Sequence, residues 1–169
     1  MAEAGYDGRP VTVLVAQDLA PMKAMGEVTH GLLRSLGMNV DFVATDWGTV
    51  GARRAVKSPP GQGGWNVFYS WFPGVQGINP ASYLPLRANG ERAWFGWPTS
   101  PEVEAARDKW FEAPDFEAEK AAVAEMNAAA LSRVTFLPTG FYKTFQAWRS
   151  NVTGVTAGPL PYFWGVAKA

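Results

Sequence analysis

A strand–helix–strand pattern in residues 11–45 constrains the fold of this chain more than any other feature of its sequence. Residues 11–16 form a short run rich in β-branched side chains, which is typical of a buried strand. Residues 38–45 form a second apolar run. Between them, apolar residues recur every three or four positions, as on one face of a helix, at Met22, Met25, Val28, Leu32, Leu33 and Leu36. Because a helix that joins two strands in this way makes them parallel, the pattern predicts a right-handed βαβ unit.

The remaining elements extend this pattern. Ser100 before Pro101, and Asp115 before an alanine-rich run, are typical helix starts, because Ser and Asp side chains accept hydrogen bonds from the first free backbone amides. In chain order we predict a helix at 47–56, a strand at 65–71, helices beginning at Ser100 and Asp115, and short strands at 134–137, 142–148 and 161–166. The expected fold class is α/β, with βαβ units and a mostly parallel sheet flanked by helices.

The composition excludes several kinds of site. The chain has 169 residues, the size of one domain, and contains no cysteine and a single histidine, His30. It therefore has no disulfide scaffold, no cysteine-ligated metal, no thiol nucleophile and no histidine-rich metal site. Fifteen basic residues balance fifteen acidic ones, so electrostatics gives no reason to expect nucleic acid or an anionic membrane as a partner.

The middle of the sequence is uncharged and rich in aromatic residues. Residues 58–86 contain no charged side chain, and nine aromatic residues lie between Trp65 and Trp97. For several of these rings, packing in a core is as good an interpretation as contact with a ligand. They are Trp65, Phe68, Trp94 and Trp97.

Trp71 supports a sharper hypothesis. It stands at the end of a predicted strand and before a Gly-rich loop, which is where open α/β sheets bind ligands. Gly74 and Gly77 let backbone amides and carbonyls approach a ligand closely. Gln76 and Asn79 can orient a ligand without charge. The sequence therefore predicts that Trp71 faces a ligand.

Catalytic arrangements are weak. His30 lies in the middle of a predicted helix, and Asp41 and Asp46 flank the second strand as a possible carboxylate pair. Structural roles at a helix surface, a strand end and a helix cap are the favoured interpretation of all three. Arg53 and Arg54 can bind an anion, but a solvated helix face is favoured for them as well.

The N-terminus lacks the basic and apolar regions of a signal peptide, and no stretch reaches the roughly 18 apolar residues of a membrane span. Taken literally, this predicts a cytoplasmic protein. The alternative is that the chain is a piece of a longer one.

Short motifs occur in an order that is similar to that of a known family. They lie at residues 33–40, 45–47, 65–71, 79–80 and 136–138. This series resembles the C-terminal lobe of the family 5 extracytoplasmic solute-binding proteins, the dipeptide/oligopeptide-type receptors of ABC importers, and it runs through most of the chain. The resemblance implies one lobe of a type II periplasmic-binding-protein-like fold.

The resemblance also implies a binding protein and not an enzyme, with no catalytic residue, metal or cofactor. In the family, two lobes close like a hinge over a small solute, and the loaded form docks on a membrane permease. The full-length protein would then be periplasmic or extracytoplasmic. Trp71 matches the family's pocket tryptophan. The ligand-binding residues that we expect are Tyr69, Trp71, Phe72, Gly74, Gln76 and Asn79.

One position departs from the peptide-binding pattern. Peptide receptors of this family typically hold the ligand's amino group with an aspartate three residues after the tryptophan, where this chain has Gly74. Residues 58–90 contain no carboxylate at all. A free ammonium group would lack its counter-charge here. We therefore expect a neutral or anionic solute, or a larger one with an apolar face, in place of a peptide with a free N-terminus.

The resemblance predicts a division of the chain into residues 1–141, the lobe itself, and residues 142–169, a tail that returns to the first lobe. We also expect an exposed apolar face and self-association of an isolated lobe. That face would include Trp71, Phe72, Phe141 and Tyr142. Two alternatives stay open: an all-β carbohydrate-binding module with tryptophan platforms, and a small hydrolase that uses Asp41 or Asp46 with His30.

Overall fold

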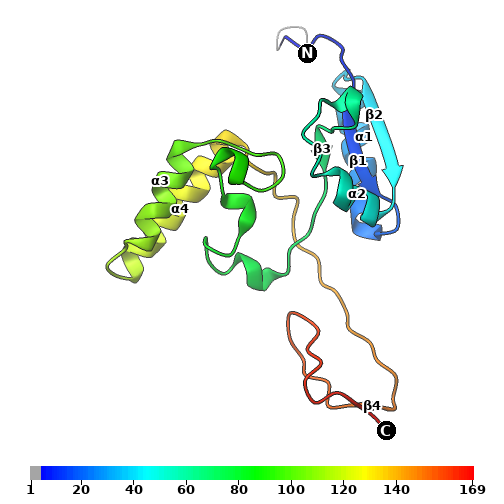
Figure 1. The fold of residues 1–169 in the computed structure, drawn as a ribbon, viewed down its shortest axis with the longest axis vertical. Coiled ribbons are helices and arrows are strands. Elements are labelled where there is room, and N and C mark those ends of the chain that lie inside the picture. The colour runs from blue at the N-terminus through cyan, green and yellow to red at the C-terminus, as the bar shows by residue number, and fades with distance from the viewer. Residues whose placement is uncertain (1–4) are drawn as a thin grey trace. The chain divides into compact units, whose positions relative to one another are not determined.

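A computed structural model describes residues 5–169 (Figure 1). The chain folds as two compact units, which meet in the sequence between Trp71 and Phe72. None of the helices in the described residues has the length and hydropathy needed to cross a membrane.

The first unit contains the predicted βαβ arrangement. Its elements are β1 (Val11–Ala16), α1 (Ala20–Ser35), β2 (Val40–Thr45), α2 (Trp47–Arg53), the short 3-10 helix η2 (Pro60–Gln62) and β3 (Val67–Phe68). The strand order is β2-β1-β3, and β1 runs parallel to both neighbours. The register pairs Val11 with Val40 and Val13 with Val67. The α/β class and the parallel sheet are therefore confirmed.

Strand β1 forms the centre of the first core. Val13, Leu14 and Val15 are fully buried, because the strand has a neighbour on each side and helices against it. Helix α1 approaches β1 closely at Gly26. A Cβ atom at that position would lie 2.5 Å from a methyl carbon of Val15, so only glycine allows this contact. The predicted stripe on α1 is only partly used: Met22 is buried and Met25 and Leu33 pack against this core, whereas Val28, Leu32 and Leu36 are exposed.

The second unit is built around two helices. Helices α3 (Pro101–Phe111) and α4 (Phe116–Arg133) lie side by side (Figure 1). Ser100 and Asp115 cap them as predicted, since their side chains accept hydrogen bonds from the backbone amides of Val103 and Ala118. The core of this unit is formed by Leu86, Ala88, Val103, Ala106, Met126 and Ala130. The smaller elements are η3 (Gly74–Gly77), η4 (Leu84–Leu86), η5 (Gly90–Arg92), β4 (Val152–Thr153) and β5 (Ala167–Lys168).

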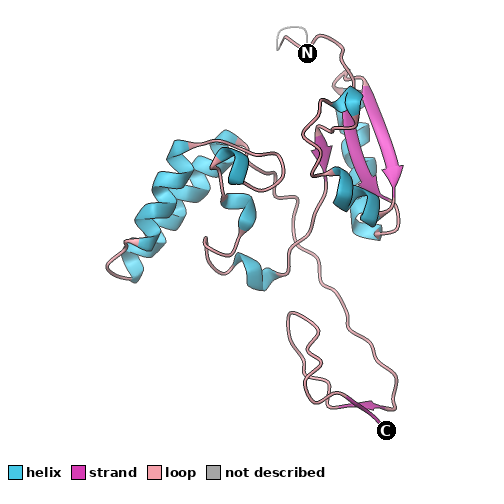
Figure 2. Cartoon of the chain, viewed as in Figure 1, coloured by secondary structure: helices cyan, strands magenta, loops and turns pink. Residues whose placement is uncertain are grey.

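Several strand predictions are wrong. The predicted strand at 65–71 is reduced to β3, and residues 134–137 form no strand, because α4 ends with Val134 in a left-handed conformation (φ 53°). The segment 142–148 is loop (Figure 2). At 161–166 only one isolated bridge forms, between Thr156 and Tyr162. Apolar alternation favours an extended chain, but a strand also needs a neighbour with which to pair. Residues 134–137 and 142–148 have no such neighbour within the described residues, and the other two segments pair at only one or two positions.

The predicted boundary after residue 141 stays a prediction, since the compact units meet earlier in the chain. Beyond residue 141 the chain carries the β4–β5 hairpin. Phe141 is fully exposed, and Trp71 and Tyr142 are each about half exposed, as the predicted apolar face requires of them individually. Phe72 differs from that expectation, because its ring is partly covered by other aromatic rings.

Candidate functional site

Trp71 ends the first unit, three residues after β3. Its side chain is 48% exposed, although tryptophan is usually well buried. The structure records no ring contact or hydrogen bond for it among residues 5–169. Because β3 is parallel to β1, Trp71 follows the carboxyl end of a parallel strand, the edge at which such sheets bind ligands. An uncovered indole at this position can form an apolar or stacking wall.

Phe72 begins the second unit and belongs to a cluster of aromatic rings. Its ring lies 5.3 Å from that of Tyr83 and 5.2 Å from that of Trp94, both in edge-to-face geometry. Tyr83 in turn contacts Phe136, and Trp94 contacts Phe95. Burial raises the pKa of Tyr83. Phe72 therefore anchors the start of the following loop.

Ser82 holds that loop in shape. Its hydroxyl donates to the backbone carbonyl of Gln76 at 2.9 Å, and its backbone amide donates to the side-chain oxygen of Asn79 at 3.0 Å. One side of the Asn79 amide is therefore already occupied. The Gln76 side chain is exposed, and no hydrogen bond is recorded for it within residues 5–169. A Cβ atom at Gly74 would have no heavy atom within 4 Å, so the loop is open at this point.

Tyr69 is buried and does not lie at the surface. Its ring is buried in the first core with Val13, Leu14 and Val50. The hydroxyl oxygen is shielded from solvent and has no hydrogen bond of normal geometry in the described residues. Burial raises the pKa of Tyr69, an effect that the Thr29 hydroxyl opposes. A direct contact between Tyr69 and a ligand therefore stays a prediction.

The residues of the hydrolase hypothesis have separate structural partners. The ring of His30 packs against Phe42, with 4.9 Å between ring centroids. Asp41 accepts a hydrogen bond from the Thr12 hydroxyl at 3.1 Å. Asp46 caps α2 by accepting hydrogen bonds from the Thr49 hydroxyl at 2.6 Å and the Thr49 amide at 2.9 Å, which lower its pKa. No pair of these side chains forms the hydrogen bond that a nucleophile and its base would need.

Arg53 and Arg54, the residues of the anion-site hypothesis, also make structural contacts. Arg53 donates to the backbone carbonyls of Gly63 at 2.8 Å and Gly64 at 3.1 Å. The backbone carbonyl of Arg54 accepts from the Trp65 indole at 3.1 Å, and Trp65 packs against the first core. These contacts hold the loop before β3. Within residues 5–169 there is also no group of three acidic or histidine side chains that could hold a metal ion.

Sequence reasoning missed the contacts within the aromatic cluster that contains Phe72. Tyr83 and Phe136 are 53 positions apart, and no spacing rule joins them. The high density of aromatic residues between Trp65 and Trp97 was a signal for a cluster, but it could not indicate which rings meet. Phe136 is in the segment that was predicted to be a strand, and its ring is instead covered by the second core.

Comparison with known proteins identifies relatives. The chain is 32% identical over 167 residues to a probable peptide ABC transporter periplasmic-binding protein, y4tO, of Sinorhizobium fredii (strain NBRC 101917 / NGR234). The match covers 99% of this chain and 32% of that protein, so the chain spans about a third of the length of this curated relative. No protein family model matches the sequence.

The fold has a counterpart among solved structures. The dipeptide binding protein from Pseudoalteromonas sp. SM9913, in complex with Met-Leu, matches 99% of this chain and 34% of its own chain, with a TM-score of 0.74 and 22% sequence identity. This likeness concerns the fold, and it agrees with the lobe that the sequence motifs imply. The sequence relationship to a periplasmic-binding protein agrees with the resemblance to the family 5 extracytoplasmic solute-binding proteins that the motifs imply.

Proposed function

We propose that this chain supplies one lobe of the solute-binding component of an ABC importer. In this proposal the lobe helps to enclose a small solute, catalyses no reaction and needs no cofactor, and the full-length protein works in the periplasm or another extracytoplasmic space. The loaded protein then delivers its solute to a membrane permease. The observation that carries the proposal is the relationship to a periplasmic-binding protein along 99% of the chain.

Trp71 is the central residue of the proposed site. Its exposed indole follows a parallel strand and is free to stack on a solute. The adjoining loop adds the open backbone at Gly74, the unengaged side-chain amide of Gln76, and the remaining hydrogen-bonding capacity of Asn79. Tyr69 and Phe72 lie close to Trp71 in the sequence, Tyr69 in the first core and Phe72 against other aromatic rings, so we assign both to supporting that segment.

The charge of this segment favours a particular class of solute. An ammonium group that leaves water needs an anionic partner, and burying it without one is costly. Residues 58–90 offer no carboxylate, and Gly74 stands where an aspartate would be expected. We therefore propose that the site accepts a neutral or anionic solute, or a peptide-like molecule whose amino group is blocked.

Calorimetry on the full-length protein tests this solute class, with Met-Leu and N-acetyl-Met-Leu as probes. We expect the acetylated dipeptide to bind at least as tightly as the free one. Gly74→Asp should reverse the preference by roughly tenfold, because a carboxylate would then face the ammonium group. The space around Gly74 accommodates the new side chain. Gly77→Asp, at an equally open position of the same loop, is the matched control. Tighter binding of free Met-Leu to the unmodified protein would overturn the assignment.

A second measurement tests the role of Trp71. Trp71→Ala should weaken the binding of whichever probe binds by roughly tenfold, since a stacked aromatic contact contributes about 0.5–1.5 kcal/mol beyond the area that it buries. Trp110→Ala, which removes another half-buried indole on α3, should leave the affinity unchanged. Equal affinities of Trp71→Ala and the unmodified protein would contradict the proposed site.

The tail at residues 142–169 is proposed to pack on the other lobe. Its large apolar side chains support this, since Phe145, Phe163 and Trp164 are each more than three-quarters exposed within the described chain. Apolar surface of this kind is normally covered in a mature protein. In the full-length protein, fluorescence from Trp164, obtained by difference from Trp164→Phe, should have the blue emission of a buried indole. Emission typical of water would contradict the packing.

A further inference from the structure

Ser82 fixes the orientation of the Asn79 side chain. The backbone amide of Ser82 lies 3.0 Å from the side-chain oxygen of Asn79. A backbone amide can only donate a hydrogen bond, so the atom that faces it is the oxygen, and the side-chain nitrogen takes the other position. No hydrogen bond is recorded for that nitrogen within residues 5–169, and the side chain is exposed. Asn79 therefore presents N–H donors to its surroundings.

The acceptor oxygens of the same loop are largely used within it. The Ser82 hydroxyl donates to the backbone carbonyl of Gln76 at 2.9 Å and lies 3.2 Å from that of Asn79. The carbonyl of Pro73 accepts from the Gln76 amide at 2.9 Å, and the carbonyl of Val75 accepts from another amide of the loop at 3.4 Å. A solute group that donates hydrogen bonds, such as an ammonium group, therefore finds few free partners here, whereas a group that accepts them meets the Asn79 donors.

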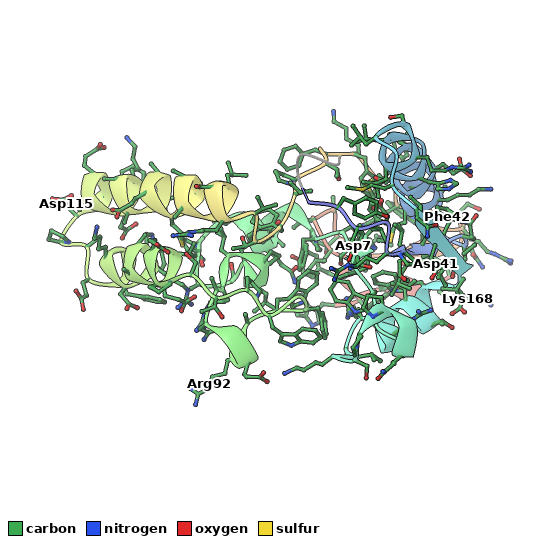
Figure 3. The ribbon with its side chains drawn as sticks, turned by 90° about the horizontal axis from the view of Figure 1, so that it is seen from above. Asp7, Asp41, Phe42, Arg92, Asp115 and Lys168 are labelled. Carbon is green, nitrogen blue, oxygen red and sulfur yellow. The ribbon has the colours of Figure 1, made fainter. Side chains whose placement is uncertain are left out.

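The loop has no charge with which to select a polar group, since residues 58–86 contain no charged side chain. The first charged side chain after it, Arg87, is paired with Glu104, with 3.4 Å between the guanidinium nitrogen and the carboxylate oxygen. Arg92 on η5 is exposed, and its side chain projects away from helices α3 and α4 (Figure 3). The direction of the loop's own hydrogen bonds is therefore its means of selection.

We propose that Ser82, by holding Asn79 as a donor, makes the solute site select molecules that present an acceptor oxygen, a carbonyl or a carboxylate, to this loop. The inference rests on the proposed function, and it adds the direction of a hydrogen bond to the solute class proposed above. Asn79 contacts the solute, and Ser82 acts through Asn79 as a positioning residue. A solute without the acceptor is rejected because it leaves the enclosed donor unpaired.

Calorimetry on the full-length protein with N-acetyl-Met-Leu tests the donor. Asn79→Asp keeps the oxygen that accepts from the Ser82 amide and replaces the free nitrogen with a second oxygen. At neutral pH it should weaken binding by roughly tenfold or more, because the donor is lost and the new oxygen repels an acceptor. The loss should shrink as the pH falls to about 4, where the introduced carboxyl group takes up a proton and can donate again.

The matched control for added charge is Asn127→Asp. Asn127 is another exposed asparagine, on α4, and the variant should bind the acetylated dipeptide like the unmodified protein at both pH values. A merely structural role of Asn79 would not produce the pH-dependent recovery, because the hydrogen bond to Ser82 is kept at either pH. Circular dichroism checks that each variant keeps its helices.

Two substitutions of Ser82 test the positioning role. Ser82→Ala should weaken the binding of N-acetyl-Met-Leu by a few-fold, because the loop carbonyls are released and Asn79 is held less firmly. Ser82→Thr keeps a hydroxyl donor and should bind like the unmodified protein. Calorimetry with N-acetyl-Met-Leu amide identifies the oxygen: an Asn79→Asp loss that persists indicates a carbonyl, and one that disappears indicates the terminal carboxylate.

Equal affinities of Asn79→Asp and the unmodified protein for N-acetyl-Met-Leu would overturn the inference while leaving the proposed function intact. A loss of the same size in Asn127→Asp would also overturn it, because added negative charge alone would then explain the effect. If the unmodified protein bound neither acetylated dipeptide, the proposed solute class would fail, and this inference with it.

Discussion

Strand β1 and the tail at residues 142–169 differ in the burial of their apolar side chains. Val13, Leu14 and Val15 are completely buried, whereas Phe145, Phe163 and Trp164 are each more than three-quarters exposed. Both segments are rich in apolar residues. The difference is that β1 has a parallel strand on each side and helix α1 packed against it, while the tail forms only the two-residue strands β4 and β5. Apolar content thus indicates which residues can form a core, and neighbouring elements decide which of them do.

The largest test of this comparison replaces a large apolar side chain in each segment. Leu14→Ala should lower the free energy of unfolding of the first unit by about 2–5 kcal/mol, because it leaves a cavity in a close-packed core. Phe145→Ala should change the stability of the chain described here by less than about 0.5 kcal/mol. Urea unfolding followed by hydrogen exchange of the β1 amides measures both. Similar losses in the two variants would break the comparison.

A smaller effect separates two glycines on one helix. Gly26→Ala should destabilise the first unit by about 1–3 kcal/mol, since the added methyl group meets Val15 in a core with no free space. Gly31→Ala, where a Cβ atom has no neighbour within 4 Å, should stabilise α1 by about 0.5–1 kcal/mol. Thermal unfolding monitored by circular dichroism gives both values. The same sign for both substitutions would show that α1 does not pack on β1 at Gly26.

The smallest effect concerns the Asp46 side chain that caps α2 in the first unit. The Thr49 hydroxyl and amide hold the pKa of Asp46 below its ordinary value, so the ionised carboxylate stabilises the α2 cap at neutral pH. This contribution is fully present above about pH 4, the ordinary range of an aspartate, and is lost as the pH falls through the lowered pKa. Titration of the Asp46 carboxyl carbon by NMR should give a pKa that rises in Thr49→Val. An unchanged pKa in that variant would remove the Thr49 hydroxyl as a cause.

Local patterns allowed part of the fold and of the candidate site to be predicted. The helix caps at Ser100 and Asp115 depend on one side chain and the three residues that follow, so their signal is contained in a few adjacent positions. The exposure of Trp71 also agrees with its predicted place after a strand. In contrast, the burial of Tyr69 and the anchoring of Phe72 depend on partners more than ten residues away, and sequence spacing does not identify such partners.

Sequence by itself determined the βαβ order, the helix starts, and a central stretch without charge, because each of these follows from the periodicity or chemistry of neighbouring residues. Only the tertiary structure decided that residues 134–137 form no strand and that the Phe136 ring packs against Tyr83. It also decided that Phe111 and Phe116 remain at the surface while Met126 is buried. The physical reason is that burial is a property of pairs of surfaces, and a chain read one residue at a time does not specify which surfaces will meet.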